Sequence, residues 1–264
     1  EFKATQFSDF SSALSEISSL KAREIVVGYE LSDDDRQVFE KQLNVMVSEQ
    51  YDYEDIASTL APLENQVASK LLAYVNRTQL RDLSHLQEVE HYEIKDFLQM
   101  DFATKSSLEL TANKREGKKH GTLYWLLDET KTAMGTRLLR NWVDRPLISF
   151  EEINKRADIV QLFVNNFFER ADLIEALKGV YDLERLASRV SFGKVLPVDY
   201  LQLENSLSNV PGIKNVLLAM DNPVLEPLIS QLDEIPELIA LIRQAIDESA
   251  QRVITEGGVI KSGY

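Results

Sequence analysis

The side chains with the most evident capacity for chemistry are the carboxylates that follow a strand-like segment near the N-terminus. Residues 33–35 are three consecutive aspartates, and Glu49 lies in the next strand-like segment. Carboxylates at the ends of neighbouring strands can hold Mg²⁺ for phosphoryl chemistry or nuclease activity. Adjacent residues of a helix do not converge on one point, however, and acidic residues in a first turn are favoured by the helix dipole. We therefore interpret Asp33, Asp34 and Asp35 as the start of a helix capped by Ser32.

Two histidines and a basic loop could also bind a ligand. His85 and His91 lie in a polar segment without an HExxH pattern, so we expect ordinary surface or core histidines. Residues 114–120 carry four lysines or arginines, two before Gly117 and two between Gly117 and Gly121. This loop is not a P-loop, which requires GxxxxGK[ST], and we expect it to be solvated. The alternative for such a basic loop is contact with a nucleic-acid backbone.

The densest run of distinctive residues is 121–147, which contains both tryptophans, Trp125 and Trp142. From residue 134 the apolar side chains recur at the spacing of one helical face. Arg137 and Arg140 occupy the neighbouring face, and Arg145 precedes a proline that ends the helix. The pattern indicates a buried apolar anchor with a basic flank.

Composition limits the class of protein. The chain has 264 residues, 44% hydrophobic and 27% charged, which is typical of a globular protein. It contains no cysteine, which excludes disulfides, thiolate catalysis and cysteine-based zinc sites and permits a reducing compartment. We expect a cytoplasmic protein without a signal peptide or membrane span.

Charge is unevenly distributed along the chain. The net charge is −14, and residues 111–200, with 15 basic against 13 acidic side chains, form the section that could present a basic face. An acidic chain is a poor autonomous nucleic-acid binder, because affinity for DNA depends largely on cations that displace counterions.

The elements that must position these residues fall into two groups. Residues 1–60 alternate between strand-like and helical patterns in the order β-α-β-α-β, which predicts an α/β layer with a partly parallel sheet. From about residue 100 the pattern is helical almost to residue 254, with a capping box at Ser149 and a helix end predicted at Pro211. The chain starts at Glu1 and not at Met, and both ends are expected to be cut from a longer protein.

Five ordered stretches together carry a resemblance. They are VASKLLAYVNRTQLRDL at 67–83, MDFATKSSLELT at 100–111, residues 121–147, VYDLERLASRV at 180–190 and GGVIKSGY at 257–264. In this order and spacing they resemble the MutS family of bacterial DNA mismatch-repair proteins. Residues 1–60 match more weakly, but their pattern agrees with the second half of that family's RNase H-like connector domain.

The resemblance implies an α+β multidomain fold, a small α/β unit followed by a mostly α-helical core or lever. Residues 1–63 would be part of the connector, 64–100 a connecting helix and linker, 101–254 the helical core or lever, and 255–264 the start of the clamp insertion. The whole protein would bind mismatched duplex DNA as a homodimer, use ATP and Mg²⁺, and recruit MutL. This section would contain no catalytic, cofactor or metal site, and it would bind DNA weakly or not at all.

The resemblance also places residues 121–147 at the root of the lever. Arg137, Arg140 and Arg145 then become candidates for pairing with Asp128, Asp144, Asp182 or Glu184, and not with phosphate. The candidate residues of this junction are Trp125, Asp128, Arg137, Arg140, Trp142, Asp144, Arg145, Asp182, Glu184 and Arg185.

Three functions compete. The first is a non-catalytic connector and lever that couples DNA binding to an ATPase and to partner recruitment. The second is a metal-dependent nuclease, which would need several converging carboxylates where the sequence offers one triplet. The third is a helical protein-interaction scaffold unrelated to repair, which periodicity alone cannot separate from the first. In the first case the core helices lack their returning partners, so some apolar stripe is expected to be exposed and to favour association in solution or in the crystal.

Overall fold

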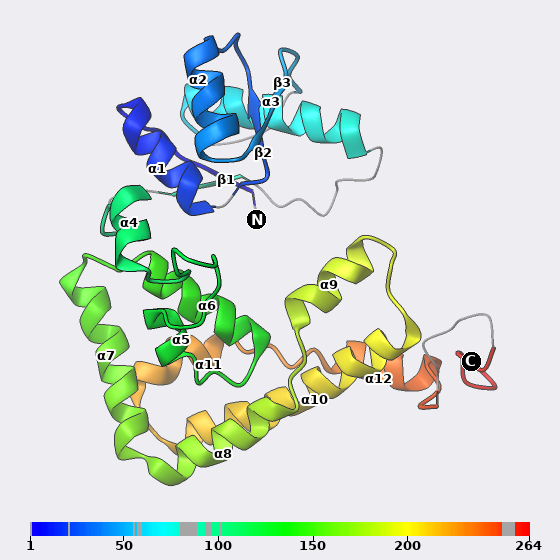
Figure 1. The fold of residues 1–264 in the computed structure, drawn as a ribbon. Helices are drawn as coiled ribbons and strands as arrows, with labels where there is room; N and C mark the ends of the chain where they lie inside the picture. The colour runs from blue at the N-terminus through cyan, green and yellow to red at the C-terminus, as the bar shows by residue number, and fades with distance from the viewer. Residues whose placement is uncertain are drawn as a thin grey trace. The chain divides into compact units, whose positions relative to one another are not determined.

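Figure 1 shows the computed structural model of the chain, which describes residues 2–20, 22–54, 56, 60–79, 89–92, 97–100, 102–249 and 257–264. The chain divides into two units, residues 1–109 and 110–264. Each unit has its own cluster of buried hydrophobic side chains.

Two small parallel sheets form the frame of the first unit. β1 (Lys3–Ala4) pairs with β4 (Glu90–His91), and β2 (Glu24–Val27) pairs with β3 (Met46–Glu49). Parallel strands require a crossover connection. Between β2 and β3 this is α2 (Asp33–Gln37) with the π-helical turn η1 (Val38–Gln42). The remaining helices of the unit are α1 (Phe10–Leu20), α3 (Pro62–Gln79) and α4 (Phe102–Leu108).

The core of the first unit lies under the β2–β3 pair. Val27 at the end of β2, Leu31 in the following loop and Phe39 in η1 are buried together. Side chains of α1 pack against them, because Leu14 and Ile17 recur at helical spacing on one face. The β-branched run at 24–27 therefore forms a strand that is covered by helices, as parallel sheets require.

The predicted α/β layer with parallel pairing is confirmed, but its division into two sheets was not predicted. β1 does not join β2 and β3, and pairs instead with β4 at register Lys3 with Glu90 and Ala4 with His91. The strand β4 is two residues long and polar, so it carries no alternating hydrophobic signal. His91 lies in this strand, whereas His85 lies outside the described residues.

Helices form the second unit. They are α5 (Leu123–Leu127), α6 (Ala133–Asp144), α7 (Phe150–Asn165), α8 (Phe167–Lys178), α9 (Leu183–Ser191), α10 (Pro197–Ala219), the 3-10 turn η3 (Pro223–Leu225), α11 (Glu226–Ser230) and α12 (Pro236–Ala245). The long helix α10 packs against α8, α9 and α12 (Figure 1). Ile213, Leu217 and Leu225 form the centre of the hydrophobic cluster beside α7 and α8.

Pro211 does not end a helix, so that prediction is wrong. α10 continues through Pro211 to Ala219. A proline inside a helix removes one backbone hydrogen bond and costs about 3 kcal/mol. The neighbouring side chains Leu207, Val210 and Ile213 are all buried, and packing on both sides of the proline offsets this cost.

The ends of other helices follow the sequence signals. Ser32 accepts a hydrogen bond from the Asp35 N–H, and Ser149 accepts one from the Glu152 N–H, which confirms both predicted caps. At the C-terminal end, α12 stops at Ala245 and residues 246 and 260 form an isolated antiparallel bridge. Residues 250–256, which include the predicted helix end and the start of the predicted clamp insertion, lie outside the described residues.

Candidate functional site

The short helices α5 and α6 are each started by a threonine. Thr122 accepts a hydrogen bond from the Trp125 N–H at 3.1 Å, and Thr132 accepts one from the Gly135 N–H at 3.0 Å. Tyr124 on α5 is buried, and its hydroxyl donates to the Thr136 carbonyl on α6 at 3.4 Å. Burial also raises the pKa of the Tyr124 hydroxyl. These contacts fix the loop between the two helices.

Arg137 on α6 reaches two carboxylates at the start of α9. Its two terminal nitrogens donate to the Asp182 carboxylate at 2.9 and 2.7 Å, and its Nε donates to Glu184 at 2.8 Å. A guanidinium that grips a carboxylate through two parallel hydrogen bonds is the strongest common form of protein ion pair. The structure thus brings Arg137 together with two of its four candidate partners.

Asp182 has a second role at the same position. Its carboxylate accepts a hydrogen bond from the Arg185 N–H at 3.2 Å and so caps α9. The hydrogen bonds from Arg137 are the main cause of the lowered pKa of Asp182, against a raising effect of burial. The same carboxylates raise the pKa of Arg137. One carboxylate therefore both starts α9 and joins it to α6.

Buried polar groups that no sequence motif indicated join α9 to α10. Asp199, which is buried, accepts from Arg189 Nη1 at 3.1 Å and from the Leu196 N–H at 2.8 Å. Ser206 is fully buried, accepts from the Tyr181 N–H at 2.9 Å and donates to a carbonyl of its own helix. The available signal was Pro197 with an aspartate two residues later, a common helix start.

Asp128 is paired with a lysine and not with an arginine. Its carboxylate accepts from Lys119 at 2.7 Å and from the Thr130 hydroxyl at 2.7 Å. These hydrogen bonds, from Lys119 first, lower the pKa of Asp128, and the pKa of Lys119 is raised in turn. The pair ties the basic loop to the end of α5.

The basic loop itself has a defined backbone. The Asn113 side chain accepts a hydrogen bond from the Glu116 N–H at 2.7 Å and donates one to the His120 carbonyl at 3.0 Å. Gly117 and Gly121 take positive φ angles of 66° and 79°, which a glycine adopts without steric cost. Two of its cations face carboxylates within the unit, Lys118 with Glu116 and Lys119 with Asp128.

The tryptophans are not the buried anchors that the sequence suggests. Trp125 is 44% exposed and packs on the His120 ring at 4.6 Å, and Trp142 is 38% exposed. The Arg156 guanidinium of α7 lies 3.9 Å from the centre of the Trp142 ring, so this ring joins α6 to α7 by a cation–π contact. Each aromatic ring covers a cationic or polar neighbour at the surface, and Tyr124 is the buried ring of this stretch.

The other candidate residues take different positions. Arg140 is exposed on α6 near Tyr124, and within the described residues no carboxylate lies in ion-pair distance of it. Asp144 and Arg145 are half-buried at the end of α6, and both are engaged in interactions. Arg185 contributes its backbone N–H to the Asp182 cap. The junction is therefore carried by Arg137, Asp182 and Glu184.

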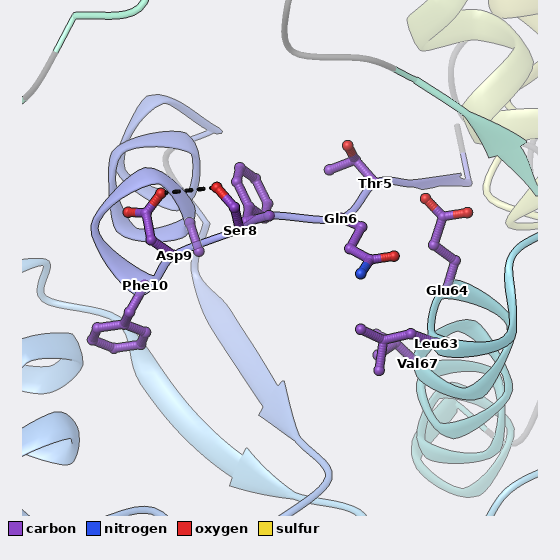
Figure 2. Close-up of a pocket in the computed structure, with 10 residues that line it drawn as sticks. Thr5, Gln6, Ser8, Asp9, Phe10, Leu63, Glu64 and Val67 are labelled. Carbon is purple, nitrogen blue, oxygen red and sulfur yellow. Dashed lines mark hydrogen bonds between the residues drawn. The ribbon is translucent and has the colours of Figure 1, made fainter.

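A cleft of about 400 Å³ lies in the first unit, beyond the end of β1 (Figure 2). Figure 2 shows Ser8 and Asp9 at the start of α1 on one side, and Leu63, Glu64 and Val67 of α3 on the other. Glu64 is buried, and its carboxylate lies 2.8 Å from His91 Nδ1 and accepts from a backbone N–H. The Asp9 carboxylate caps α1. Both carboxylates thus already have internal partners.

The acidic triplet does not converge with Glu49. Residues 33–35 occupy the first turn of α2, while Glu49 pairs with Arg36 and accepts from the Tyr51 hydroxyl at 2.8 Å. These hydrogen bonds, from Tyr51 first, lower the pKa of Glu49. Across the described parts of the chain, no group of three or more His, Asp or Glu side chains has the geometry to hold a metal ion.

Comparison with known families matches both units. The family model of MutS domain II matches residues 1–87, and that of MutS domain III matches residues 103–262. The chain belongs to the MutS family. Its fold is that of the MutS connector followed by the helical MutS core, a small α/β part before a helical region, which confirms the resemblance.

Curated MutS relatives match the chain from end to end. The DNA mismatch repair protein MutS of Lactococcus lactis subsp. cremoris (strain MG1363) is 70% identical over 268 residues, covering 100% of this chain and 32% of that protein. The protein of the same name from Streptococcus suis (strain 98HAH33) is 58% identical with the same coverage. The chain thus spans about a third of the length of these MutS relatives.

None of the helices in the described part of the chain has both the length and the apolar character needed to cross a bilayer.

Proposed function

We propose that this chain is the non-catalytic connector and lever section of a DNA mismatch-recognition ATPase. In this role it couples the binding of mismatched duplex DNA to the ATPase and supports recruitment of MutL. ATP and Mg²⁺ act elsewhere in the whole protein, which works as a homodimer in the cytoplasm. The observation that carries the proposal is the match of MutS domains II and III to the two units in order.

The contacts of α6 support a mechanical role. Arg137 ties α6 to α9, and the stacked pair of Trp142 and Arg156 ties it to α7. Asp199 and Ser206 tie α9 and the segment before it to α10. A displacement of α6 would therefore be passed on to α7, α9 and α10 through charged and polar contacts of defined geometry.

Two alternatives are less well supported. A nuclease needs carboxylates that converge on one metal, and the acidic triplet and Glu49 point to different partners. A helical scaffold unrelated to repair does not account for the match to two consecutive MutS domains.

The first test uses the chain itself. We expect no ATP hydrolysis above the buffer rate, and weak binding of a duplex with a G·T mismatch that scarcely exceeds binding of the matched duplex. The net charge of −14 gives the physical reason, because few phosphates can be neutralised. Selective binding of the mismatched duplex at physiological salt would show that recognition lies in this section, against the proposal.

The second test uses the full-length parent protein with Arg137→Ala. We expect ATP hydrolysis and mismatch binding to persist separately, while the effect of ATP on DNA affinity decreases. Arg140→Ala, on the same helix and without an ion pair among the described residues, is the matched control. An unchanged ATP effect in Arg137→Ala would contradict the coupling role of this contact.

A further inference from the structure

The long helix α10 contains two helix-breaking residues next to each other in its interior. Pro211 and Gly212 lie within the 23 residues from Pro197 to Ala219. Proline and glycine disfavour a helix interior more than any other residues, the first through its missing N–H and the second through backbone entropy. Pro211 has no N–H to donate to the carbonyl of Leu207, one turn before it. The backbone of α10 is therefore weakest at this step.

The packing of α10 does not require the glycine. Gly212 is helical without a positive φ angle, and it is exposed. A Cβ at this position would meet no atom of another segment within 4 Å. Alanine would therefore fit here without strain and would favour the helix more. A residue that breaks a local rule without a reason in the packing is expected at a functional position.

The part of α10 before Pro211 is joined to its neighbours by polar contacts. The Asp199 carboxylate accepts from Arg189 of α9 at 3.1 Å, and the Glu204 carboxylate accepts from Arg243 of α12 at 2.7 Å. Hydrogen bonds between charged groups are strong and directional. We therefore expect α9 and α12 to move together with this part of the helix.

The part of α10 after Gly212 belongs to the apolar cluster of the unit. Ile213 and Leu217 are buried there with Leu225 of η3, and side chains of α7 and α8 pack against them. A closely packed cluster transmits strain and moves as one body. The helix-breaking pair thus lies at the border between two groups of elements, with α9 and α12 on one side and α7 and η3 on the other.

The end of α8 contacts α10 close to this border. Its C-cap Gly179 lies so near Asn209 that a Cβ on the glycine would be 2.7 Å from the amide nitrogen of that side chain. The Asn205 amide also donates to the Gly179 carbonyl at 3.2 Å. Glycine permits such a close approach of one backbone to another helix. The contact gives a bend at Pro211 a fixed pivot.

We propose that Pro211 and Gly212 form a hinge in α10, about which α9 and α12 rotate relative to α7 and the apolar cluster. The helix α6 spans this hinge, because Arg137 joins it to α9 and Trp142 joins it to α7. A bend in α10 therefore changes the distance between the two attachment points of α6. The inference rests on the proposed coupling function and adds the element whose bending carries the coupling.

Amide hydrogen exchange of the chain tests the hinge independently of coupling. The N–H groups of residues 212–215 lose their acceptors one turn earlier whenever α10 bends. Relative to the unfolded rate, they should exchange at least about tenfold faster than those of residues 203–207 and 216–218. In the double variant Pro211→Ala and Gly212→Ala this difference should disappear. Uniform protection along α10, or exchange that rises steadily toward its end, would overturn the proposal.

The second experiment measures the factor by which ATP changes the affinity of the full-length parent protein for a duplex with a G·T mismatch. In the chain, Gly212→Ala should raise the Tm of the second unit by about 1–3 °C, because alanine strengthens the helix. In the parent, the same substitution should reduce the ATP factor at least about threefold. Asn215→Ala, at an exposed position about one turn later on α10, is the matched control. It also increases helix propensity, so it should raise the Tm and leave the ATP factor unchanged.

The possible outcomes separate the hinge from the proposed function. An ATP factor that is unchanged in Gly212→Ala, or that falls equally in Asn215→Ala, would overturn the hinge while the proposed function stands. A Tm lowered by Gly212→Ala would show that the packing needs the glycine, against the proposal. A parent protein in which ATP has no effect on DNA affinity would refute the proposed function, and the exchange pattern of α10 then decides the hinge by itself.

Discussion

The contact of Arg137 with Asp182 and Glu184 gives the sharpest test of how the helical unit is held together. Arg137→Ala removes three hydrogen bonds to carboxylates, of which two are the parallel pair to Asp182. It leaves the cap of α9 in place, because Asp182 still accepts from the Arg185 N–H. The substitution thus tests the link between α6 and α9 and not the helix itself.

The size of the effect follows from burial. Hydrogen bonds to charged groups contribute about 1.5–3 kcal/mol, whereas exposed ion pairs contribute about 0.2–1 kcal/mol. The Arg137 side chain is 46% exposed and that of Asp182 is 15% exposed, so solvent screens the pair on one side. We expect a loss of about 1–2 kcal/mol, which corresponds to a shift of about 0.5–1 M in the urea midpoint.

Tryptophan fluorescence is the appropriate assay. The two units need not unfold together, so a global signal would mix two transitions. Both tryptophans, Trp125 and Trp142, belong to the second unit, and their emission reports that unit alone. The urea curve of the tryptophan signal then gives the free energy of unfolding of the unit that contains the contact.

Matched variants make the result decisive. Arg140→Ala removes the same side chain three residues later on α6, so helix propensity and net charge change equally. Arg140→Ala should alter the free energy of unfolding by less than about 0.5 kcal/mol.

Arg137→Lys keeps the charge but loses the two parallel hydrogen bonds, so its loss of stability should lie between those of Arg140→Ala and Arg137→Ala. A double-mutant cycle with Asp182→Asn should return a coupling of about 1 kcal/mol. Equal effects of Arg137→Ala and Arg140→Ala would refute the reasoning.

Three other predictions concern the second unit. Its stability should be constant between about pH 5 and 9 and fall as the pH drops below about 4. The reason is that the pKa values of Asp128 and Asp182 are lowered in the folded chain, so each carboxylate takes up a proton more readily when unfolded. Acid titration of the tryptophan signal checks this, and stability that rises below about pH 4 would contradict it. Leu225→Ala should cost about 2–5 kcal/mol, since this side chain is fully buried, whereas Leu126→Ala should cost less than about 0.5 kcal/mol in the same urea assay. Ser206→Ala should cost about 1–3 kcal/mol, because the Tyr181 N–H loses its buried acceptor, and a loss below that of Leu126→Ala would be evidence against this role.

Local signals predicted the helix starts well, because each depends on a few neighbouring residues. Ser32 and Ser149 were identified as caps from their own segments, and the structure confirms both. The strand β4 could not be found in this way. It has two polar residues, and its pairing with β1 depends on contacts between segments some 87 positions apart in the chain, at Lys3 and Glu90.

Long-range polar contacts were predictable only in part. The sequence supplied three arginines and four acidic residues as possible partners, and the structure pairs Arg137 with Asp182 and Glu184 while Asp128 takes Lys119 instead. Which arginine meets which carboxylate depends on the direction of each side chain and on how the helices are oriented. The spacing of residues along one helix specifies neither. The length of α10 was underestimated for a related reason, because tertiary packing overrode the local effect of Pro211.

The position of α6 depends in part on directional contacts at its surface. The helix has no fully buried residue, although Met134, Leu139 and Val143 are half-buried. Three directional contacts add to this packing: the Tyr124 hydroxyl from α5, the Arg137 ion pairs to α9, and the Arg156 stack on Trp142 from α7. Directional contacts of this kind can be exchanged at moderate cost, whereas a packed core resists small displacements. The charges of this stretch, more than its tryptophans, therefore make it suitable as a joint between helices that must move together.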